Sequence, residues 1–192
     1  MSDDPLRRFQ AWFREAEAAG VEVPEAMTLA TATRDGRPSA RFVLLKGADD
    51  DGFVFYTGYG SRKSDELAEN PRAALVFYWR QLGRQVRVEG VVERVSEEES
   101  AAYFATRPRA SQLAAWASAQ SRPLASRAKL EQRYAELERE YAGREVPLPP
   151  HWGGYRLRPD AYEFWVHRDN RLHDRERYTR QDGGWKVELL AP

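Results

Sequence analysis

Apolar and polar residues alternate over most of the chain, with the two-residue period that is typical of β-strands. Residues 27–34 alternate up to a turn at Asp35 and Gly36, and residues 37–46 follow as a second strand, so the pair predicts a β-hairpin. In the long alternation of residues 84–95, the valines share one face and the polar side chains share the other. The same pattern predicts strands at 52–59 and 73–79 and a return to β structure over 155–190.

Helical spacing replaces this alternation in several segments. In residues 5–19, apolar side chains recur every three or four positions until Gly20 ends the pattern. Ser96 and the three glutamates after it form a capping box, which predicts the start of a helix that carries Tyr103. Ser111 is expected to cap the helix that follows, and further helices are predicted at 61–70 and 126–141.

These elements predict a mainly β protein of the α+β class, in which six or seven short antiparallel strands form a small barrel with helices at its edges. The length of 192 residues suits one domain, which is expected to span residues 1–192. Its expected parts are an N-terminal helix at 5–19, barrel strands at about 26–95, a helical insertion at about 96–142 and C-terminal strands at about 152–190.

Composition excludes several classes of function. Thirty basic and thirty acidic residues cancel, so the chain has no net field to attract nucleic acid or an anionic membrane, and any anion site must be local. There are no cysteines and only three histidines, so no disulfide and no metal site are predicted. Neither of the common glycine-rich phosphate loops occurs. No apolar run is long enough for a signal peptide or a membrane span, so a cytoplasmic protein is expected.

Two segments in the first third of the chain combine basic residues with the ends of strands. The strand Arg41–Lys46 is apolar on both faces, so it is predicted to be buried on both sides with a cation at each end. Lys46 then either reaches solvent from the strand end or faces a ligand. In segment 56–63, a strand leads through a glycine turn into a helix that begins beside Arg62 and Lys63. This helix start is either an anion site or an ordinary serine cap with two solvated cations.

A third group lies in the helical insertion. Tyr103 and Arg107 are four residues apart, so they are expected to share a helix face. Together with Ser111 they could close on a phosphate from one side. The alternative is a capped corner between two helices.

The fourth group is near the C-terminus. Arg171, His173 and Arg175 fall on one face if this segment is a strand. Neighbouring cations repel one another unless an anion or an acid lies opposite them, so a polyanionic ligand is one interpretation of this spacing. A surface strand that alternates basic and other residues is the alternative.

In this order, the four groups resemble the pyridoxine/pyridoxamine 5′-phosphate oxidases, a family of FMN enzymes that complete the synthesis of pyridoxal 5′-phosphate. The similarity spans nearly the whole chain. Its most specific segments are RFVLLK at 41–46, GSRK at 60–63, YFATRPRASQLAAWAS at 103–118, WGGYRL at 152–157 and RLHDR at 171–175.

The resemblance implies an FMN-binding split β-barrel that forms a homodimer, with FMN at two sites between the subunits. It also implies oxidation of pyridoxamine 5′-phosphate and pyridoxine 5′-phosphate to pyridoxal 5′-phosphate, with O2 reduced to H2O2 and no metal. One alternative is a related flavin oxidase that acts on another aromatic compound, of the phenazine type. Another is a non-catalytic split-barrel protein that binds flavin or haem.

The roles of individual residues follow from the resemblance by position. The implied FMN contacts are Arg41, Phe42, Val43, Leu44, Leu45, Lys46, Tyr56, Thr57, Arg62, Lys63, Gln85, Gln120, Ser121, Trp165 and Arg175. The implied substrate contacts are Lys46, Tyr103, Arg107, Ser111, Arg171, Leu172 and His173. Arg171 and His173 flank the substrate's pyridine ring and are the implied catalytic residues.

The chain departs from the family in two places. Val166 stands where members often have a glutamine. The chain also begins at the family's DPL segment, so the N-terminal arm that some members fold over the substrate is not expected.

Overall fold

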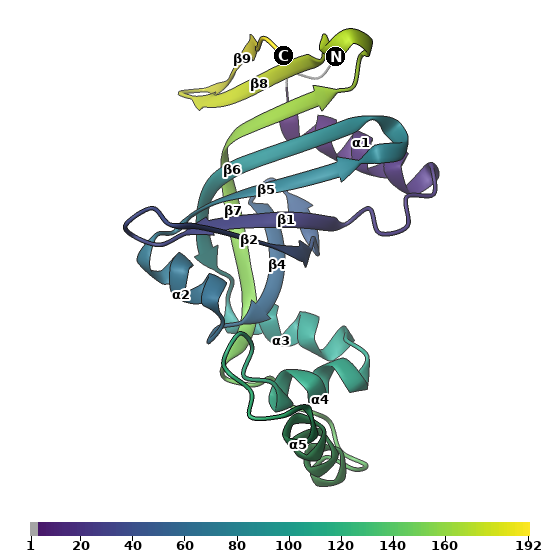
Figure 1. The fold of residues 1–192 in the computed structure, drawn as a ribbon, viewed down its shortest axis with the longest axis vertical. Coiled ribbons are helices and arrows are strands. Elements are labelled where there is room, and N and C mark those ends of the chain that lie inside the picture. The colour runs from purple at the N-terminus through teal and green to yellow at the C-terminus, as the bar shows by residue number, and fades with distance from the viewer. Residues whose placement is uncertain (1–3) are drawn as a thin grey trace.

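One strongly curled antiparallel sheet forms the body of the molecule (Figure 1). The computed structural model describes residues 4–192, and the sheet has nine strands within them. Seven follow the order β2-β1-β5-β6-β7-β4-β3, while β8 pairs with β7 and β9 pairs with β8. The strands are β1 (Ala26–Ala32), β2 (Pro38–Leu44), β3 (Gly47–Asp49), β4 (Gly52–Gly58), β5 (Arg72–Trp79), β6 (Arg84–Arg94), β7 (Trp152–Val166), β8 (Asp174–Gln181) and β9 (Gly184–Leu189).

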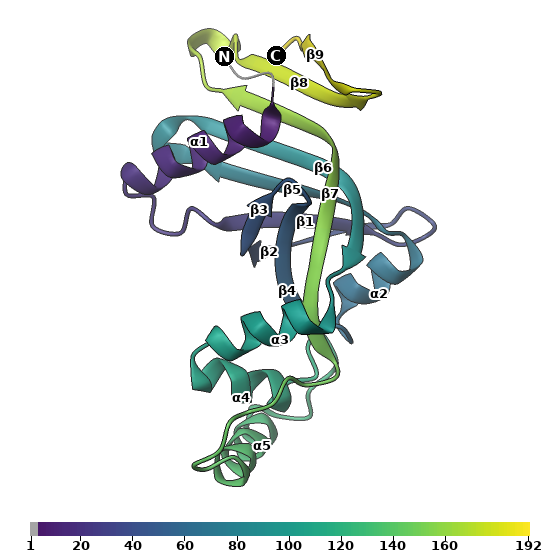
Figure 2. The same cartoon turned by 180° about the vertical axis from the view of Figure 1, so that it is seen from behind.

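The helices lie at the margins of this sheet. Figure 2 shows α1 across the sheet on the side opposite to α2, and α3, α4 and α5 grouped beyond the end of β4. None of the helices in the described part of the chain is both long and apolar enough to cross a membrane. The helices are α1 (Pro5–Ala18), α2 (Arg62–Glu69), α3 (Glu97–Thr106), α4 (Arg109–Ala117) and α5 (Arg127–Glu140), with short 3-10 turns at Arg80–Leu82 and Asp169–Arg171.

Two hydrophobic clusters hold these elements together. In the larger one, Phe9 of α1 packs its ring against Phe53 and Phe77 of the sheet, at centroid distances of 4.8 and 5.0 Å. The smaller cluster fastens α3, α4 and α5 to the start of β7, and Phe104 and Trp152 lie within it. Burial of large aromatic side chains is the main source of stability at both places.

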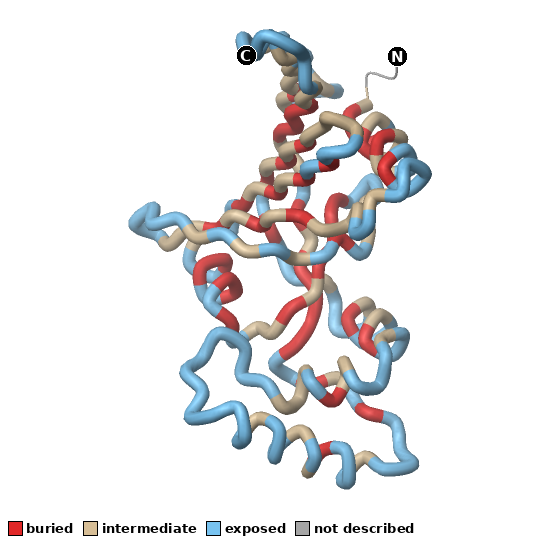
Figure 3. The backbone as a smooth tube through the Cα atoms, turned by 45° about the vertical axis from the view of Figure 1, so that its right-hand side comes forward, coloured by how far each residue is buried: buried red, intermediate tan, exposed pale blue. Residues whose placement is uncertain are grey.

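Strand β7 connects the two ends of the molecule. It is 15 residues long, and its first half pairs with β4 while its second half pairs with β8. Trp152 therefore lies beside the helical group, and Trp165 lies beside the C-terminal hairpin. Figure 3 shows that the middle of the molecule is buried, whereas the helical end and the C-terminal hairpin are largely exposed.

Several sequence predictions are confirmed. The hairpin predicted over residues 27–46 is the antiparallel pair β1 and β2. In β6, Val86 and Val88 are fully buried, as the alternation predicts. The Ser96 side chain accepts a hydrogen bond from the Glu99 amide and caps α3.

Other predictions are wrong. The sheet has nine strands in the described residues rather than six or seven, partly because residues 47–49 form the short strand β3. Strand β2 is not buried on both faces within this chain, since Phe42 is 78% exposed and Leu44 is 42% exposed. Ser111 does not cap α4, because the helix begins earlier, at Arg109 after Pro108. The Ser111 amide instead donates to the Pro108 carbonyl inside the first turn.

Candidate active site

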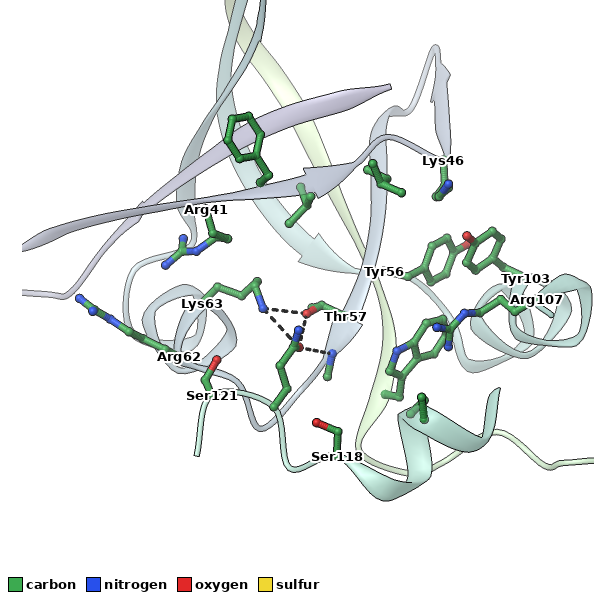
Figure 4. A pocket seen from close by; sticks show the side chains of 18 of the residues that line it. Arg41, Lys46, Tyr56, Thr57, Arg62, Lys63, Tyr103, Arg107, Ser118 and Ser121 are labelled. Carbon is green, nitrogen blue, oxygen red and sulfur yellow. Dashed lines mark hydrogen bonds between the residues drawn. The ribbon is translucent and has the colours of Figure 1, made fainter. Parts of the chain in front are cut away.

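A cavity of about 710 Å³ lies between the sheet and the helical group (Figure 4). Strand β2, the end of β4, the start of α2, and helices α3 and α4 supply its walls. Cavities of this size accommodate small organic ligands and cofactors. In Figure 4, Arg41, Arg62 and Lys63 lie on one side of the cavity, and Lys46, Tyr103 and Arg107 lie on the other. The cavity thus has two cationic ends.

Lys63 carries a buried ammonium group at the first end. The residue is only 5% exposed, and its Nζ atom donates to Thr57 Oγ1 at 2.9 Å, Ser61 Oγ at 3.1 Å and Gln120 Oε1 at 3.3 Å. All three acceptors are neutral. Burial, and the positive charge of Arg41, lower the pKa of Lys63 to about 8. The N-terminal turn of α2 adds a partial positive charge here, so this end favours an anion.

The buried carboxylate of Glu66 holds the two arginines at the same end. Glu66 Oε1 accepts from Arg62 Nε at 2.8 Å, and Glu66 Oε2 lies 3.3 Å from Arg41 Nη2. Burial alone would favour the neutral acid, but hydrogen bonds from Ser39, Thr31 and both arginines lower the pKa of Glu66 to about 2. Glu66 is therefore ionised at neutral pH, and its carboxylate fixes both guanidinium groups.

Aromatic rings build the second end. The rings of Tyr56 and Tyr103 stack with centroids 3.9 Å apart, and Trp152 lies parallel to Tyr56 at 5.5 Å. The Arg107 guanidinium carbon lies 4.6 Å from the centre of the Trp152 ring. Arg107 Nη1 is buried and has no hydrogen-bond partner, and burial lowers the pKa of this guanidinium. An unsatisfied buried donor is costly, so this end also fits an anionic ligand.

Two glycines at the start of β7 make room for these rings. A Cβ atom on Gly154 would lie 2.7 Å from the nearest Tyr56 ring carbon, and one on Gly153 would lie 2.1 Å from Tyr59 Oη. Residues with side chains would displace both tyrosines. The WGG segment thus allows an aromatic ring to lie flat against the strand backbone.

A second group of candidate residues lies across β6, β7 and β8. Gln85 pairs with Trp165, and Trp165 pairs with Arg175, so the three form one row. The buried carboxylate of Glu163 accepts from Arg175 Nε at 2.8 Å and from Arg87 Nη2 at 2.7 Å. This row is beside the C-terminal hairpin, at the end of β7 away from the cavity (Figure 1).

The prediction that Arg171, His173 and Arg175 share a strand face is wrong. Strand β8 begins only at Asp174, because Asn170 and Arg171 adopt left-handed backbone conformations with φ of 56° and 63°. They form a tight turn instead of a strand.

The turn nevertheless brings His173 to the same group. Its ring lies 4.5 Å from the Trp165 ring, centroid to centroid. The Arg168 amide donates to His173 Nδ1 at 3.1 Å. In the neutral imidazole, this hydrogen bond assigns the proton to Nε2.

Two family models cover most of the chain. The model described as pyridoxamine 5′-phosphate oxidase matches residues 13–140, and the model described as pyridoxine 5′-phosphate oxidase C-terminal dimerisation region matches residues 152–192. The chain belongs to the pyridoxamine 5′-phosphate oxidase family. The predicted family is therefore confirmed.

Curated relatives support the same assignment. A protein named pyridoxine/pyridoxamine 5′-phosphate oxidase from Rubrobacter xylanophilus is 65% identical, over 98% of this chain and 87% of its own. A protein of the same name from Salinibacter ruber is 58% identical, over 100% of this chain and 91% of its own.

Solved structures confirm the predicted split-barrel fold. PhzG from Burkholderia lata 383, in complex with tetrahydrophenazine-1-carboxylic acid, has a TM-score of 0.95 and 37% identity, covering 100% of this chain and 94% of that one. A pyridoxamine 5′-phosphate oxidase-related, FMN binding protein from Nostoc punctiforme PCC 73102 has a TM-score of 0.78 at 20% identity, covering 98% of both chains.

In this member of the pyridoxamine 5′-phosphate oxidase family, the candidate residues fall into two separate sets. Those that line the cavity are Arg41, Phe42, Val43, Leu44, Lys46, Tyr56, Thr57, Arg62, Lys63, Tyr103, Arg107, Gln120 and Ser121. Those that do not are Leu45, which is buried in the core, and Gln85, Ser111, Trp165, Arg171, Leu172, His173 and Arg175.

Sequence reasoning missed three residues that organise this oxidase-family site. Glu66 and Glu163 are buried acids that hold arginines, and Trp152 lies beneath Arg107. Glu163 lies in EFW at 163–165 and Trp152 lies in WGG at 152–154, and the aromatic residues of both segments signal burial. Nothing in the pattern around Glu66 distinguishes it from the other acids of its helix.

Proposed function

We propose that this chain is an FMN-dependent oxidase that converts pyridoxamine 5′-phosphate and pyridoxine 5′-phosphate to pyridoxal 5′-phosphate, with O2 as the electron acceptor. Family membership and the 65% and 58% identities to curated proteins of that name support the reaction. The observation that carries the proposal is the single cavity with a cation-rich site at each end. One end suits the phosphate of FMN and the other suits the phosphate of a substrate.

The residues at the Lys63 end fit the phosphate of a flavin mononucleotide. A buried ammonium group with only neutral partners needs an anion. Arg41 and Arg62 beside it are already fixed by Glu66, so little order is lost when the anion binds. We assign Thr57, Gln120 and Ser121 to the same ligand, because they line this side of the cavity.

When bound, the flavin would supply the redox chemistry: it would carry two electrons and one proton from the substrate's C4′ to O2, and a second proton, lost from the amine or hydroxyl group, would complete H2O2. Oxidation of pyridoxamine 5′-phosphate gives an imine that water hydrolyses to the aldehyde and ammonia, and oxidation of pyridoxine 5′-phosphate gives the aldehyde directly. The protein contributes position and charge. Lys46, Tyr103 and Arg107 would hold the substrate phosphate, and Arg171 and His173 would flank the pyridine ring.

We propose further that the site is completed by a second copy of the chain. Within one chain, the row containing Trp165 and Arg175 lies beside the C-terminal hairpin, away from the cavity. The family model for residues 152–192 is described as a dimerisation region. Phe42 and Leu44 expose apolar surface on the wall of the cavity, as expected for a face that a second copy covers. A cytoplasmic location belongs to the same proposal.

A second candidate function comes from the similarity to PhzG at a TM-score of 0.95. An oxidase of that kind would act on an aromatic carboxylic acid instead of a phosphate ester. The 65% identity to a curated phosphate-ester oxidase, compared with 37% to PhzG, favours the first candidate.

One aerobic assay separates these functions. The purified chain is loaded with FMN, and peroxide is measured with pyridoxamine 5′-phosphate, with pyridoxamine and with tetrahydrophenazine-1-carboxylic acid. We expect peroxide, and the aldehyde product, mainly with pyridoxamine 5′-phosphate. Turnover of the phenazine acid alone would transfer the proposal to the second candidate. Failure of the apoprotein to quench FMN fluorescence would contradict both.

A further inference from the structure

The Arg107 side chain is held in an unusual way. It follows α3 at the C-cap position and lies over two aromatic rings, Trp152 at 4.6 Å and Phe104 at 5.6 Å. No carboxylate of the described residues pairs with it, and its Nη1 atom is buried without a partner. Ring faces, not acceptors, therefore fix this guanidinium.

The other end of the cavity shows the contrast. There, Glu66 fixes Arg41 and Arg62 by accepting their hydrogen bonds, so part of each guanidinium edge is already occupied. An aromatic ring contacts the flat face of a guanidinium and leaves its N–H groups free at the edge. The Arg107 guanidinium is thus held in place while the N–H groups at its edge are free to bind a ligand.

The Trp152 ring is well placed to act as this support. It is 8% exposed, lies at the first position of β7, and is parallel to Tyr56 and Tyr103 at centroid distances of 5.5 and 6.3 Å. Phe104 contacts it edge-on at 5.2 Å. Rings on several sides prevent the indole from turning away from Arg107.

We propose that Trp152 is a positioning residue that gives this oxidase its preference for phosphorylated over unphosphorylated substrates, acting through Arg107. The inference rests on the proposed function in one respect, the assignment of the substrate phosphate to the Arg107 end. It adds Trp152 as a determinant of substrate choice. Trp152 contacts the Arg107 guanidinium, and the guanidinium contacts the phosphate.

The test compares phosphate preference in three FMN-loaded variants. The preference is the ratio of kcat/KM for pyridoxamine 5′-phosphate to kcat/KM for pyridoxamine. Trp152→Leu should lower this ratio by roughly 3–30-fold, the range of a cation–π contact in a partly desolvated site. Trp152→Phe keeps a weaker ring and should give an intermediate loss, which also serves if the leucine variant does not fold.

Trp116→Leu is the matched control. Trp116 packs on the same small hydrophobic cluster, but its ring contacts Tyr141 and His151, and its N–H donates to the Pro147 carbonyl. The same change there should leave the phosphate preference within twofold of the parent. An equal fall in the control would mean that general loosening of the cluster explains the Trp152 result.

A double-mutant cycle shows whether Trp152 acts through Arg107. In an Arg107→Ala background, Trp152→Leu should change the phosphate preference by less than about twofold, since the group it positions is gone. The proposal is overturned if the two losses multiply, or if Trp152→Leu weakens both substrates equally.

Equilibrium binding keeps this test independent of the proposed reaction. Pyridoxal 5′-phosphate and pyridoxal are dialysed against the FMN-loaded protein, and the ratio of their Kd values is compared across the same variants. A protein that oxidises neither substrate would refute the proposed function, yet the Kd ratio would still decide the role of Trp152. An unchanged ratio in Trp152→Leu and Trp152→Phe would refute that role.

Discussion

At the scale of one residue, the proposed role of Lys63 in binding an anion has a cost in stability. Its ammonium group is buried among hydroxyl and amide oxygens, and its partners among residues 4–192 include no carboxylate. A charge in such a place is stabilised mainly when an anion arrives. The FMN-free protein should therefore carry a measurable penalty at this residue.

The first prediction concerns the pH dependence of that penalty. The folded pKa of Lys63, about 8, lies below the ordinary value of 10.5, so between these values the unfolded chain binds more protons than the folded chain. The free energy of unfolding should thus rise as the pH increases from about 8 to about 10.5, by up to about 3 kcal/mol. Lys63→Met should abolish this rise and should also abolish FMN binding.

Urea unfolding of the FMN-free protein, parent and Lys63→Met, across that pH range measures the difference. Other groups titrate equally in both proteins, so only the difference between the two curves is interpreted. A parent that gains no stability over the variant as the pH rises would contradict a buried, destabilised ammonium.

At the scale of elements, the packing of β7 against β4 depends on residues that have no side chain. Gly154 faces the Tyr56 ring so closely that a methyl group would lie within 2.7 Å of it. Because Tyr56 is itself stacked on Tyr103 at 3.9 Å, it has little freedom to withdraw. A displacement of the Tyr56 and Tyr103 rings would therefore also disturb the pairing of β4 with β7.

The second prediction is that Gly154→Ala destabilises the protein by roughly 1–3 kcal/mol, the usual cost of overpacking a well-filled region. Gly184→Ala is the control, because a Cβ atom there meets nothing within 4 Å. The midpoint of urea unfolding should fall for the first variant and stay close to the parent for the second. Equal midpoints would show that the Tyr56 and Tyr103 rings can shift to accommodate the methyl group without loss of stability.

The C-terminal turn yields the third prediction. Since the Arg168 amide donates to His173 Nδ1, the neutral His173 ring should carry its proton on Nε2 and offer it as a donor. Nitrogen-15 NMR of histidine-labelled protein distinguishes the two tautomers, and the His173→Gln variant assigns the signal. A ring with its proton on Nδ1 would show that this hydrogen bond does not form in solution.

The elements themselves were largely predictable, and the details of the site were not. Alternation over residues 84–95 gave β6 correctly, because burial on one face leaves a period of two in any strand. The turn at Asn170 and Arg171 could not be foreseen, since neither residue demands positive φ and both also fit an extended strand. The partners of Glu66 come from β1, β2 and α2. A local sequence pattern cannot predict contacts between residues from separate elements.

At the scale of the whole molecule, the two sets of site residues lie at different ends of one long strand. The cavity is at the Trp152 end of β7, and the row of Trp165 and Arg175 is at the other end. A rigid strand cannot fold back to bring them together. If both sets act on one substrate, a second copy must supply one of them, and each dimer then has two sites of mixed origin.

The fourth prediction tests this by mixing two variants of low activity. Arg107→Ala impairs the cavity of its own chain, and Arg171→Ala impairs the turn that the chain would lend to its partner. In a mixed dimer, one site receives both changes and the other receives neither. After unfolding and refolding together in equal amounts, half of the dimers should be mixed, so about a quarter of the parent rate should return.

The controls are each variant refolded alone and the two variants mixed without unfolding, all assayed for peroxide with saturating FMN and with pyridoxamine 5′-phosphate well below the KM of the parent. These should stay at the low rates of the single variants, because their dimers contain no intact site. If each site lay within one chain, the mixed dimer would hold one damaged site of each kind, and co-refolding would restore nothing. Recovery only after co-refolding would therefore show that the cavity of one chain works with the C-terminal turn of the other.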